Sequence, residues 1–301
     1  MKISLPGRRS GDLSDQRGAD PGASGMGSGF GVPLGAAGGG VGGLIILAIV
    51  ILTQVLGGGG SGFDPGSVLK QLPQAPAASG PPPPRATDAD AGLVDFVSFV
   101  LDDVQGFWTT QFQQSNGGAY RRAKLVLFTS ATRTGCGSAT SAVGPFYCSA
   151  DQTAYLDLSF FRELTTRFGA PGDFAQAYVI AHELGHHVQK LTGVSDEVQA
   201  EVEKHPDKAN DLSVRQELQA DCLAGVWAHS TYERGILENG DLEEGLGAAA
   251  AVGDDRLQKQ AGARVNPETW THGSSEERVR WFRRGFDSGN ASQCDTFSGD
   301  L

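Results

Sequence analysis

The stretch His182-Glu183-Leu184-Gly185-His186 constrains the fold of this chain more than any other part of it. It places two histidines four residues apart, with a glutamate directly after the first. In a helix, positions i and i+4 lie one turn apart on the same face, so both imidazoles can bind one Zn²⁺ at about 2.0–2.1 Å. Glu183 lies about 100° further round the helix, so its carboxylate can reach the open side of the metal without binding it and take a proton from a metal-bound water.

The residues around the motif predict a helix from about Asp173 to Gly193. Apolar residues recur there at helical spacing, Asp173 and Gln176 form a capping-box pattern, and Gly193 suits the position after the last turn. The alternative is a helix whose histidines only form hydrogen bonds in a core. A five-residue match needs further context to exclude that alternative.

A second stretch, from Glu217 to Asp221, offers a third ligand for a metal bound by two histidines. Glu217 and Asp221 lie four residues apart in a mostly apolar segment, so both carboxylates share one face of a helix that Ser213 and Gln216 predict to begin there. An open zinc site needs three protein ligands, and Glu217 can be the third. Asp221 can accept a hydrogen bond from the far nitrogen of a ligand histidine. A solvated pair of acids is the alternative, but buried carboxylates need partners.

The face that carries these acids continues with Ala224 and Gly225. Small residues let two backbones approach closely. We therefore expect this helix to pack against the motif helix at Ala181 and Gly185, which would bring Glu217 to the histidines.

The remaining histidines carry weaker signals. His272 stands just before a predicted helix start, where it could stabilise the oxyanion of a tetrahedral intermediate, and a structural or exposed role is equally open. His187 and His229 are expected to be packing or surface residues. His205 lies in a polar loop predicted at 193–212 and is expected to be exposed.

Composition divides the chain. Much of the glycine and most of the proline precede residue 90. We predict a disordered cytoplasmic tail at 1–35, a transmembrane helix at 36–57, a Gly/Pro-rich linker at 58–90 and a catalytic domain at 91–301. The chain has a formal net charge of −11 and no large block of Lys and Arg, which argues against a nucleic-acid partner.

Residues 36–56 carry no charge and are long enough to span a bilayer, because 21 residues at 1.5 Å each give about 31 Å. A cleaved signal peptide and a buried helix are the alternatives. More basic residues precede this stretch than closely follow it, which favours a cytoplasmic N-terminus and a catalytic domain outside the cytoplasm. They are Lys2, Arg8, Arg9 and Arg17 before it and Lys70 after it.

The four cysteines fit an oxidising compartment, because they form an even set without a C-x-x-C motif. Three pairings are possible. We favour Cys136 with Cys148, which closes a short loop, and Cys222 with Cys294, which ties the C-terminal tail to a helix. Four reduced thiols in a cytosolic protein are the alternative.

Further elements follow from periodicity and end signals. They are a long helix at 90–114, strands at 123–128 and 153–158, a short helix at 160–168, a helix opened by Asp241 and Glu244, and a last helix opened by Ser274 and Glu277.

The chain resembles the putative neutral zinc metallopeptidase family of membrane-anchored bacterial proteins, with only the N-terminal tail and linker unmatched. The resemblance rests on the segments 144–148, 155–161, 172–187, 217–222 and 271–273. A wider likeness is to zincin peptidases whose third ligand is a glutamate. These resemblances imply a zincin-like α+β domain, mostly helical with a small sheet, in which the strand around Leu156 borders the cleft and can pair with an extended substrate.

The combined prediction is a membrane-tethered zinc endopeptidase with a peptide or protein substrate. Zn²⁺ would bind His182, His186 and Glu217, and Glu183 would act as general base with His272 assisting. One alternative is a catalytically silent, zinc-stabilised module that binds a cell-envelope partner. Another is a metal-dependent hydrolase of a non-peptide amide. The substrate and the oligomeric state stay open.

Overall fold

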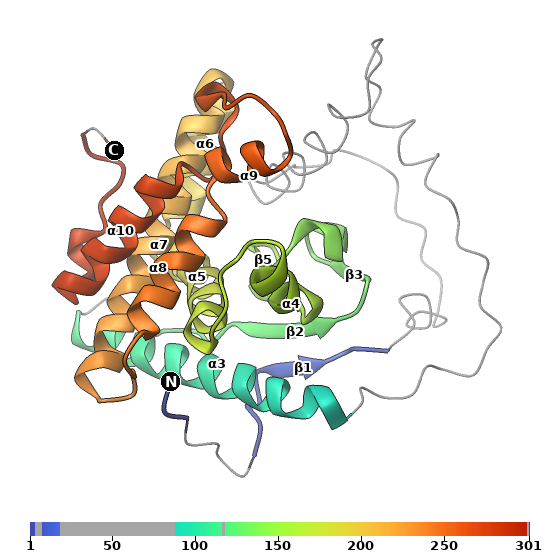
Figure 1. Ribbon diagram of the computed structural model, residues 1–301. Helices are drawn as coiled ribbons and strands as arrows, with labels where there is room; N and C mark the ends of the chain where they lie inside the picture. Colours follow the sequence, from blue (N-terminus) through green and yellow to red (C-terminus); the bar gives the residue numbers. More distant parts are fainter. Residues whose placement is uncertain (4–7, 19–87, 116–117, 300) are drawn as a thin grey trace, which may run out of the picture.

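The computed structural model describes residues 1–3, 8–18, 88–115, 118–299 and 301 (Figure 1). Helices pack beside a small sheet in this part of the chain, which confirms the predicted α+β class with a mostly helical domain. The predicted transmembrane helix at 36–57 and nearly all of the linker lie outside the described residues. No helix within the described ranges is long and apolar enough to cross a membrane.

The structure places the elements as follows. The helices are α3 (Asp88–Gln114), α4 (Ser159–Thr166), α5 (Asp173–Thr192), α6 (Val194–Lys204), α7 (Ala209–Glu233), α8 (Asp241–Ala251), α9 (Asp254–Gln260) and α10 (Ser275–Ser288). The strands are β1 (Leu13–Asp15), β2 (Lys124–Phe128), β3 (Ala131–Thr134), β4 (Gly137–Thr140), β5 (Phe146–Cys148) and β6 (Thr153–Asp157).

One sheet has the order β1-β2-β6-β5, with β5 antiparallel and the other strands parallel. Side chains alternate between its faces, so Leu125 and Leu127 join the helical core while Val126 and Phe128 belong to a smaller cluster. The smaller cluster also contains Ala139 of the β3–β4 hairpin. The sheet is therefore covered by helices on one face and by that hairpin on the other.

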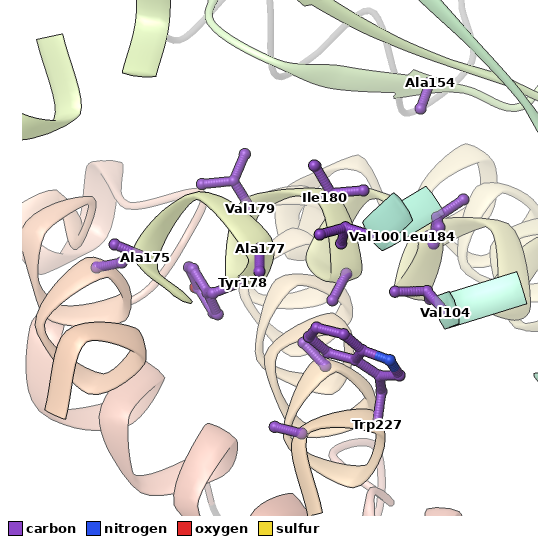
Figure 2. Packing of buried hydrophobic residues seen from close by; sticks show 14 of the residues in the cluster. Val100, Val104, Ala154, Ala175, Ala177, Tyr178, Val179, Ile180, Leu184 and Trp227 are labelled. Carbon is purple, nitrogen blue, oxygen red and sulfur yellow. The ribbon is translucent and has the colours of Figure 1, made fainter. Parts of the chain in front are cut away.

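Helix α5 lies at the centre of the domain, between the sheet, α3, α7 and α8. Nearly every residue from Phe174 to Gln189 is buried, as expected of a helix enclosed on all sides. In Figure 2, Val179 and Ile180 lie on the side of α5 nearer to Ala154 of the sheet, and Trp227 of α7 lies on the other side. The motif from His182 to His186 is thus held in place by the elements packed around α5, with His182, Glu183 and His186 each 7–9% exposed.

Two close backbone contacts hold α7 in place. A Cβ at Gly185 would lie 3.0 Å from the carbonyl oxygen of Ala220, so α5 and α7 approach closely where the sequence predicts it. Gly225 does not take part in this contact, although the sequence suggested that it would. It faces α10, where an added Cβ would lie 2.1 Å from the carbonyl oxygen of Phe282. A Cβ at Gly285 would lie 1.9 Å from the carbonyl oxygen of Cys222.

The N-terminal segment 8–18 is part of the domain, so the prediction of a disordered tail is wrong for these residues. Its strand β1 extends the sheet by pairing in parallel with β2, with Leu13 opposite Leu125. Polar and charged side chains join the segment to the rest of the domain. The Nζ of Lys124 donates to Asp12 at 2.7 Å, and Ser10 donates from its Oγ to Asp102 at 2.7 Å.

The two ends of the undescribed stretch 19–87 lie side by side. Arg17 Nη1 is 3.3 Å from a carboxylate oxygen of Asp90, which is in the first turns of α3. The Nε of Arg9 donates to Asp95, one turn further along α3, at 2.6 Å. The chain before residue 19 and the chain after residue 87 are therefore held at one place.

Several predicted helix starts are displaced. Asp173 does not cap α5, whose N-cap is Gly172, and its carboxylate instead accepts from the amino group of Met1 at 2.8 Å. Asp241 is the first residue of α8 and accepts from the backbone N–H of Glu238 at 2.8 Å. These acids still lie at helix N-termini, where negative charge is stabilising. The capping box of Ser274 and Glu277 is confirmed.

The segment 193–212 is mostly helical, whereas the sequence predicted a polar loop. It contains α6, and α7 begins at Ala209 rather than at Ser213. Helix α6 buries only Ser195 and Val198, so its apolar periodicity is weak. Its acidic first turn and its basic last residue match the helix dipole, a signal that a reading of hydrophobicity alone does not capture.

Both expected disulfides are present. Cys136 pairs with Cys148, and Cys222 with Cys294, at Cα–Cα distances of 5.8 and 5.5 Å. The second disulfide ties the C-terminal segment to α7, which carries Glu217.

The resemblance implied that the strand around Leu156 can pair with an extended substrate, but both edges of this strand are already paired. Strand β6 lies between β2 and β5. The two edge strands of this sheet are β1 and β5, and β5 also contacts α5, the helix that carries the histidines.

We expect Gly285→Ala to lower the free energy of unfolding by about 1–3 kcal/mol or more, because its methyl group would overlap the backbone of α7. Gly247→Ala is the matched control, since no atom lies within 4 Å of the added Cβ. It should be neutral or stabilising by up to about 1 kcal/mol. Urea unfolding of both variants tests this, and an unchanged stability of Gly285→Ala would contradict the close contact.

Candidate metal centre

His182, His186 and Glu217 bring one ligand atom each to within 4.8 Å of one another. The Nε2 of His182 is 3.1 Å from one carboxylate oxygen of Glu217, and the Nε2 of His186 is 3.4 Å from the other. Two imidazole nitrogens and a carboxylate oxygen are the donor set of an open three-ligand zinc site. The residues therefore fit a zinc ion, and all three predicted ligands lie together.

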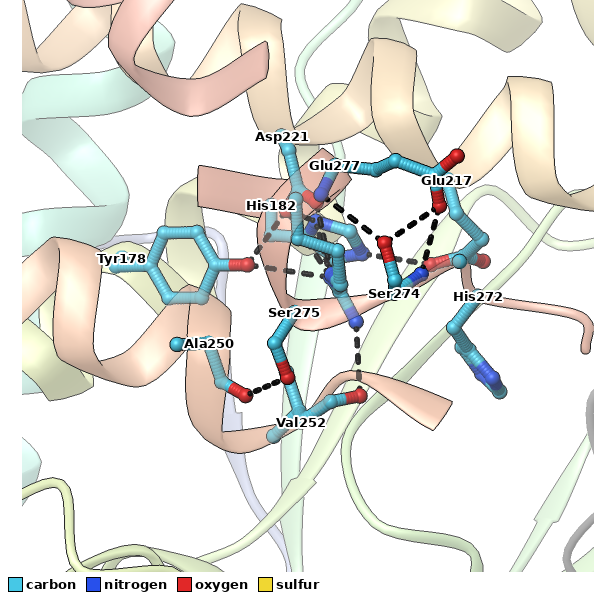
Figure 3. Close-up of polar contacts among 12 residues, drawn as sticks. Tyr178, His182, Glu217, Asp221, Ala250, Val252, His272, Ser274, Ser275 and Glu277 are labelled. Carbon is cyan, nitrogen blue, oxygen red and sulfur yellow. Dashed lines mark hydrogen bonds and ion pairs between the residues drawn. The ribbon is translucent and has the colours of Figure 1, made fainter. Parts of the chain in front are cut away.

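Asp221 accepts a hydrogen bond from the Nδ1 of His182 at 2.8 Å, so its predicted contact with a ligand histidine is present. Figure 3 shows Tyr178, His182 and Asp221 gathered at the junction of α5 and α7. Burial acts to raise the pKa of Asp221, but Arg278 and His182 outweigh it and hold that pKa below its ordinary value. A carboxylate in this position fixes the ring and directs Nε2 toward Glu217.

Gln189 orients His186 as Asp221 orients His182, and the sequence analysis did not identify it. Its Oε1 lies 2.9 Å from the Nδ1 of His186, and its amide nitrogen donates to the carbonyl oxygen of Gln216 at 2.7 Å. Gln189 is three residues after His186, on the same face of α5, which is the one signal that could have identified it. Both ligand histidines are thus oriented through Nδ1.

Glu183 lies beside the three ligands with 9% of its surface exposed. Its carboxylate makes no hydrogen bond or ion pair with any residue that the structure describes. Burial raises the pKa of Glu183 above its ordinary value, which makes it a better proton acceptor. A basic, unpaired carboxylate at the edge of a metal site is what a general base requires.

His272 is near enough to Glu217 for its charge to lower the pKa of that carboxyl group. Its Nδ1 lies 3.2 Å from Asp254, whose other oxygen accepts from the backbone N–H groups of His272 and Thr271 at 2.7 Å each. Burial acts to lower the pKa of His272, but Asp254 outweighs it and the pKa is raised. The sequence analysis did not find Asp254, because 18 residues separate it from the histidine that it orients.

The other histidines lie outside the centre, as expected. His187 is buried, with Nδ1 2.8 Å from the hydroxyl oxygen of Tyr147 and Nε2 2.5 Å from the carbonyl oxygen of Arg121. It thereby links the edge strand β5 to α5. His229 lies against the carbonyl oxygen of Phe286 at 2.6 Å, and His205 is half exposed.

A sequence profile of the family described as "Putative neutral zinc metallopeptidase" matches residues 5–297. The chain belongs to this family. The match includes the N-terminal tail and the linker, which the sequence analysis had left unmatched. The extent of this match agrees with the structure, in which β1 of the segment 8–18 is part of the sheet.

Two relatives show how far the similarity extends. The uncharacterized protein YpfJ of Escherichia coli K12 is 46% identical over 293 residues, 97% of each chain. The uncharacterized protein Rv2575 of Mycobacterium tuberculosis H37Rv is 43% identical over 254 residues, 79% of this chain and 84% of the relative. No solved structure matches the chain significantly.

We expect zinc binding to release about one proton at pH 8. Burial acts to lower the pKa of His182, but Asp221 and Glu217 raise it to about 10, so the metal-free ring is protonated at this pH and must lose its proton to bind metal. Titration calorimetry in buffers of different ionisation enthalpy measures the release. Asp221→Asn should release less, and no release from the unaltered protein at pH 8 would contradict the expectation.

Proposed function

We propose that this protein is a zinc-dependent endopeptidase. The observation that carries the proposal is the convergence of His182, His186 and Glu217 beside the unpaired carboxylate of Glu183. When bound, zinc would lower the pKa of water and polarise a carbonyl group. The family description, a zinc metallopeptidase, supports the same class of reaction.

Each step of peptide hydrolysis has a candidate residue in this chain. Glu183 accepts a proton from the attacking water and passes it to the leaving amine. His272, oriented by Asp254, donates from Nε2 to the oxygen of the scissile carbonyl as negative charge develops on it. Asp221 and Gln189 hold the two ligand histidines in a fixed orientation throughout.

The sheet offers a place for an extended peptide. Strand β5 is at its edge, contacts α5, and pairs with β6 on one side. Among the described residues, Phe146, Tyr147 and Cys148 form no backbone hydrogen bond apart from those with β6. We propose that a substrate pairs with this free edge, because strand addition recognises the main chain of a peptide.

We expect Glu183→Gln to bind zinc normally and to lose about 10²- to 10⁴-fold in cleavage rate, because the amide cannot accept the proton. Cleavage of casein or of a peptide library, with metal content measured in parallel, tests this. Glu197→Gln, an exposed change on α6, should keep full activity. Full activity in zinc-loaded Glu183→Gln would refute the role of Glu183. A zinc-loaded parent protein that cleaves none of these substrates would favour the non-catalytic binding module instead.

We propose that the domain acts outside the cytoplasm and is attached to the membrane through the apolar stretch 36–56. The two disulfides support an oxidising compartment. The N-terminal strand supports a different orientation from the one that the basic residues predict. Strand β1 pairs with β2, which supports placing residues 8–18 in the same compartment as the domain. We therefore propose that residues 8–18 and the domain lie on the same side of the membrane.

A labelling experiment tests this arrangement. Gln16→Cys, next to β1, and Asp207→Cys, on the domain, both place a thiol at an exposed position. In sealed membrane vesicles of one orientation, a membrane-impermeant maleimide should label both variants, and in vesicles of the opposite orientation it should label neither. Labelling of the two variants from opposite sides would contradict the proposal and restore a single crossing.

A further inference from the structure

We propose that Arg278 is a positioning residue of the metal centre and that it acts through Asp221. This inference rests on the zinc site of the proposed function, but it does not depend on peptide cleavage. Arg278 comes from α10, an element that supplies none of the ligands. It is 2% exposed, in a helix whose other arginines at 280, 283 and 284 are exposed.

The guanidinium group of Arg278 holds the Asp221 carboxylate with two hydrogen bonds. Its Nε donates to Oδ2 at 2.8 Å, and its Nη2 donates to Oδ1 at 3.0 Å. A planar fork that meets a carboxylate in this way fixes the plane of the carboxylate as well as its place. The same Oδ1 accepts from the Nδ1 of His182 at 2.8 Å. The orientation of the His182 ring is therefore set by a carboxylate that Arg278 has already oriented.

Arg278 is itself held from two further sides. Its Nη2 lies 3.1 Å from the hydroxyl oxygen of Tyr178, and its Nη1 donates to the carbonyl oxygen of Val252 at 3.3 Å. The hydroxyl of Tyr178 in turn donates to Asp221. Three helices, α5, α7 and α10, thus share one buried network in which Tyr178, Asp221 and Arg278 are each at most 2% exposed.

The burial of Asp221 explains why an arginine is needed. The carboxylate is fully buried, and a buried charge without a partner is strongly destabilising. When zinc is bound, the imidazole of His182 is neutral, so its N–H gives Asp221 one hydrogen bond and no compensating charge. Arg278 provides the charge, so Asp221 can stay in place and keep accepting from His182.

The contact between α7 and α10 fixes the place of this arginine. Gly225 and Gly285 let the two backbones touch, and the capping box of Ser274 and Glu277 fixes the first turn of α10. A shift of α10 would move the guanidinium group away from Asp221. The C-terminal helix therefore contributes to the geometry at zinc without touching it.

The test is zinc affinity, measured by competition with a chromophoric chelator, together with the absorption spectrum of the Co²⁺-substituted protein. Arg278→Met should weaken zinc binding by about 10- to 100-fold and change the cobalt spectrum. The control Arg280→Met, an exposed change on the same helix, should do neither. Asp221→Asn should weaken zinc binding by a similar factor. The double variant should bind zinc no more weakly than the weaker-binding single variant, because Arg278 acts through Asp221.

Each outcome decides the proposal. The proposal is overturned if a folded Arg278→Met protein keeps the zinc affinity and the cobalt spectrum of the parent. It is also overturned if the fold-losses of zinc affinity in the two single variants multiply in the double variant. If Arg278→Met does not fold, Arg278→Lys keeps the charge but not the fork. It should bind zinc several-fold more weakly, and parental affinity would overturn the proposal.

The same measurements separate this proposal from the proposed function. A parent protein that binds zinc tightly but cuts no peptide refutes the peptidase and leaves the role of Arg278 intact. A parent protein that does not bind zinc at all overturns both.

Discussion

The backbone contact between α5 and α7 is the constraint on which the site depends. The two helices meet where Gly185 lies against Ala220, and an added Cβ at the glycine position would be only 3.0 Å from the Ala220 carbonyl oxygen. This closeness lets the short side chain of a glutamate on α7 reach two imidazoles on α5. A larger residue at position 185 would press on the backbone of α7 at Ala220, and the resulting shift of the helix would move Glu217 relative to the histidines.

The charges of the buried side chains also shape the site. Asp221 is balanced by Arg278, whereas Glu217 faces two imidazoles and Glu183 has no partner among the described residues. Once His182 has lost its proton, as metal binding requires, the site holds an excess of buried negative charge on the side of the histidines. A divalent cation complements that excess, and this explains why the same residues can be both buried and reactive.

Local patterns in the sequence predicted the ligands but not their surroundings. His182, His186 and Glu217 follow from helical spacing, and Asp221 follows from its place one turn beyond Glu217. Gln189, Asp254 and Arg278 could not be found with the same certainty, because each acquires its role only through tertiary contacts. Strand β1 was missed because it is only three residues long and lies in a polar segment, so it gives no periodic signal. It is stabilised by pairing with β2, which the sequence does not reveal. The fold class, both disulfides and the placement of most helices were predictable, whereas the helix starts and the edge strand were not.

The most direct test of the central claim is a crystal structure of the zinc-loaded protein with anomalous diffraction at the zinc edge. The account predicts one peak bonded to the Nε2 atoms of His182 and His186 and to a carboxylate oxygen of Glu217, each at about 2.0–2.2 Å. A zinc ion bound elsewhere, or a Glu217 carboxylate outside bonding distance of the metal, would contradict it.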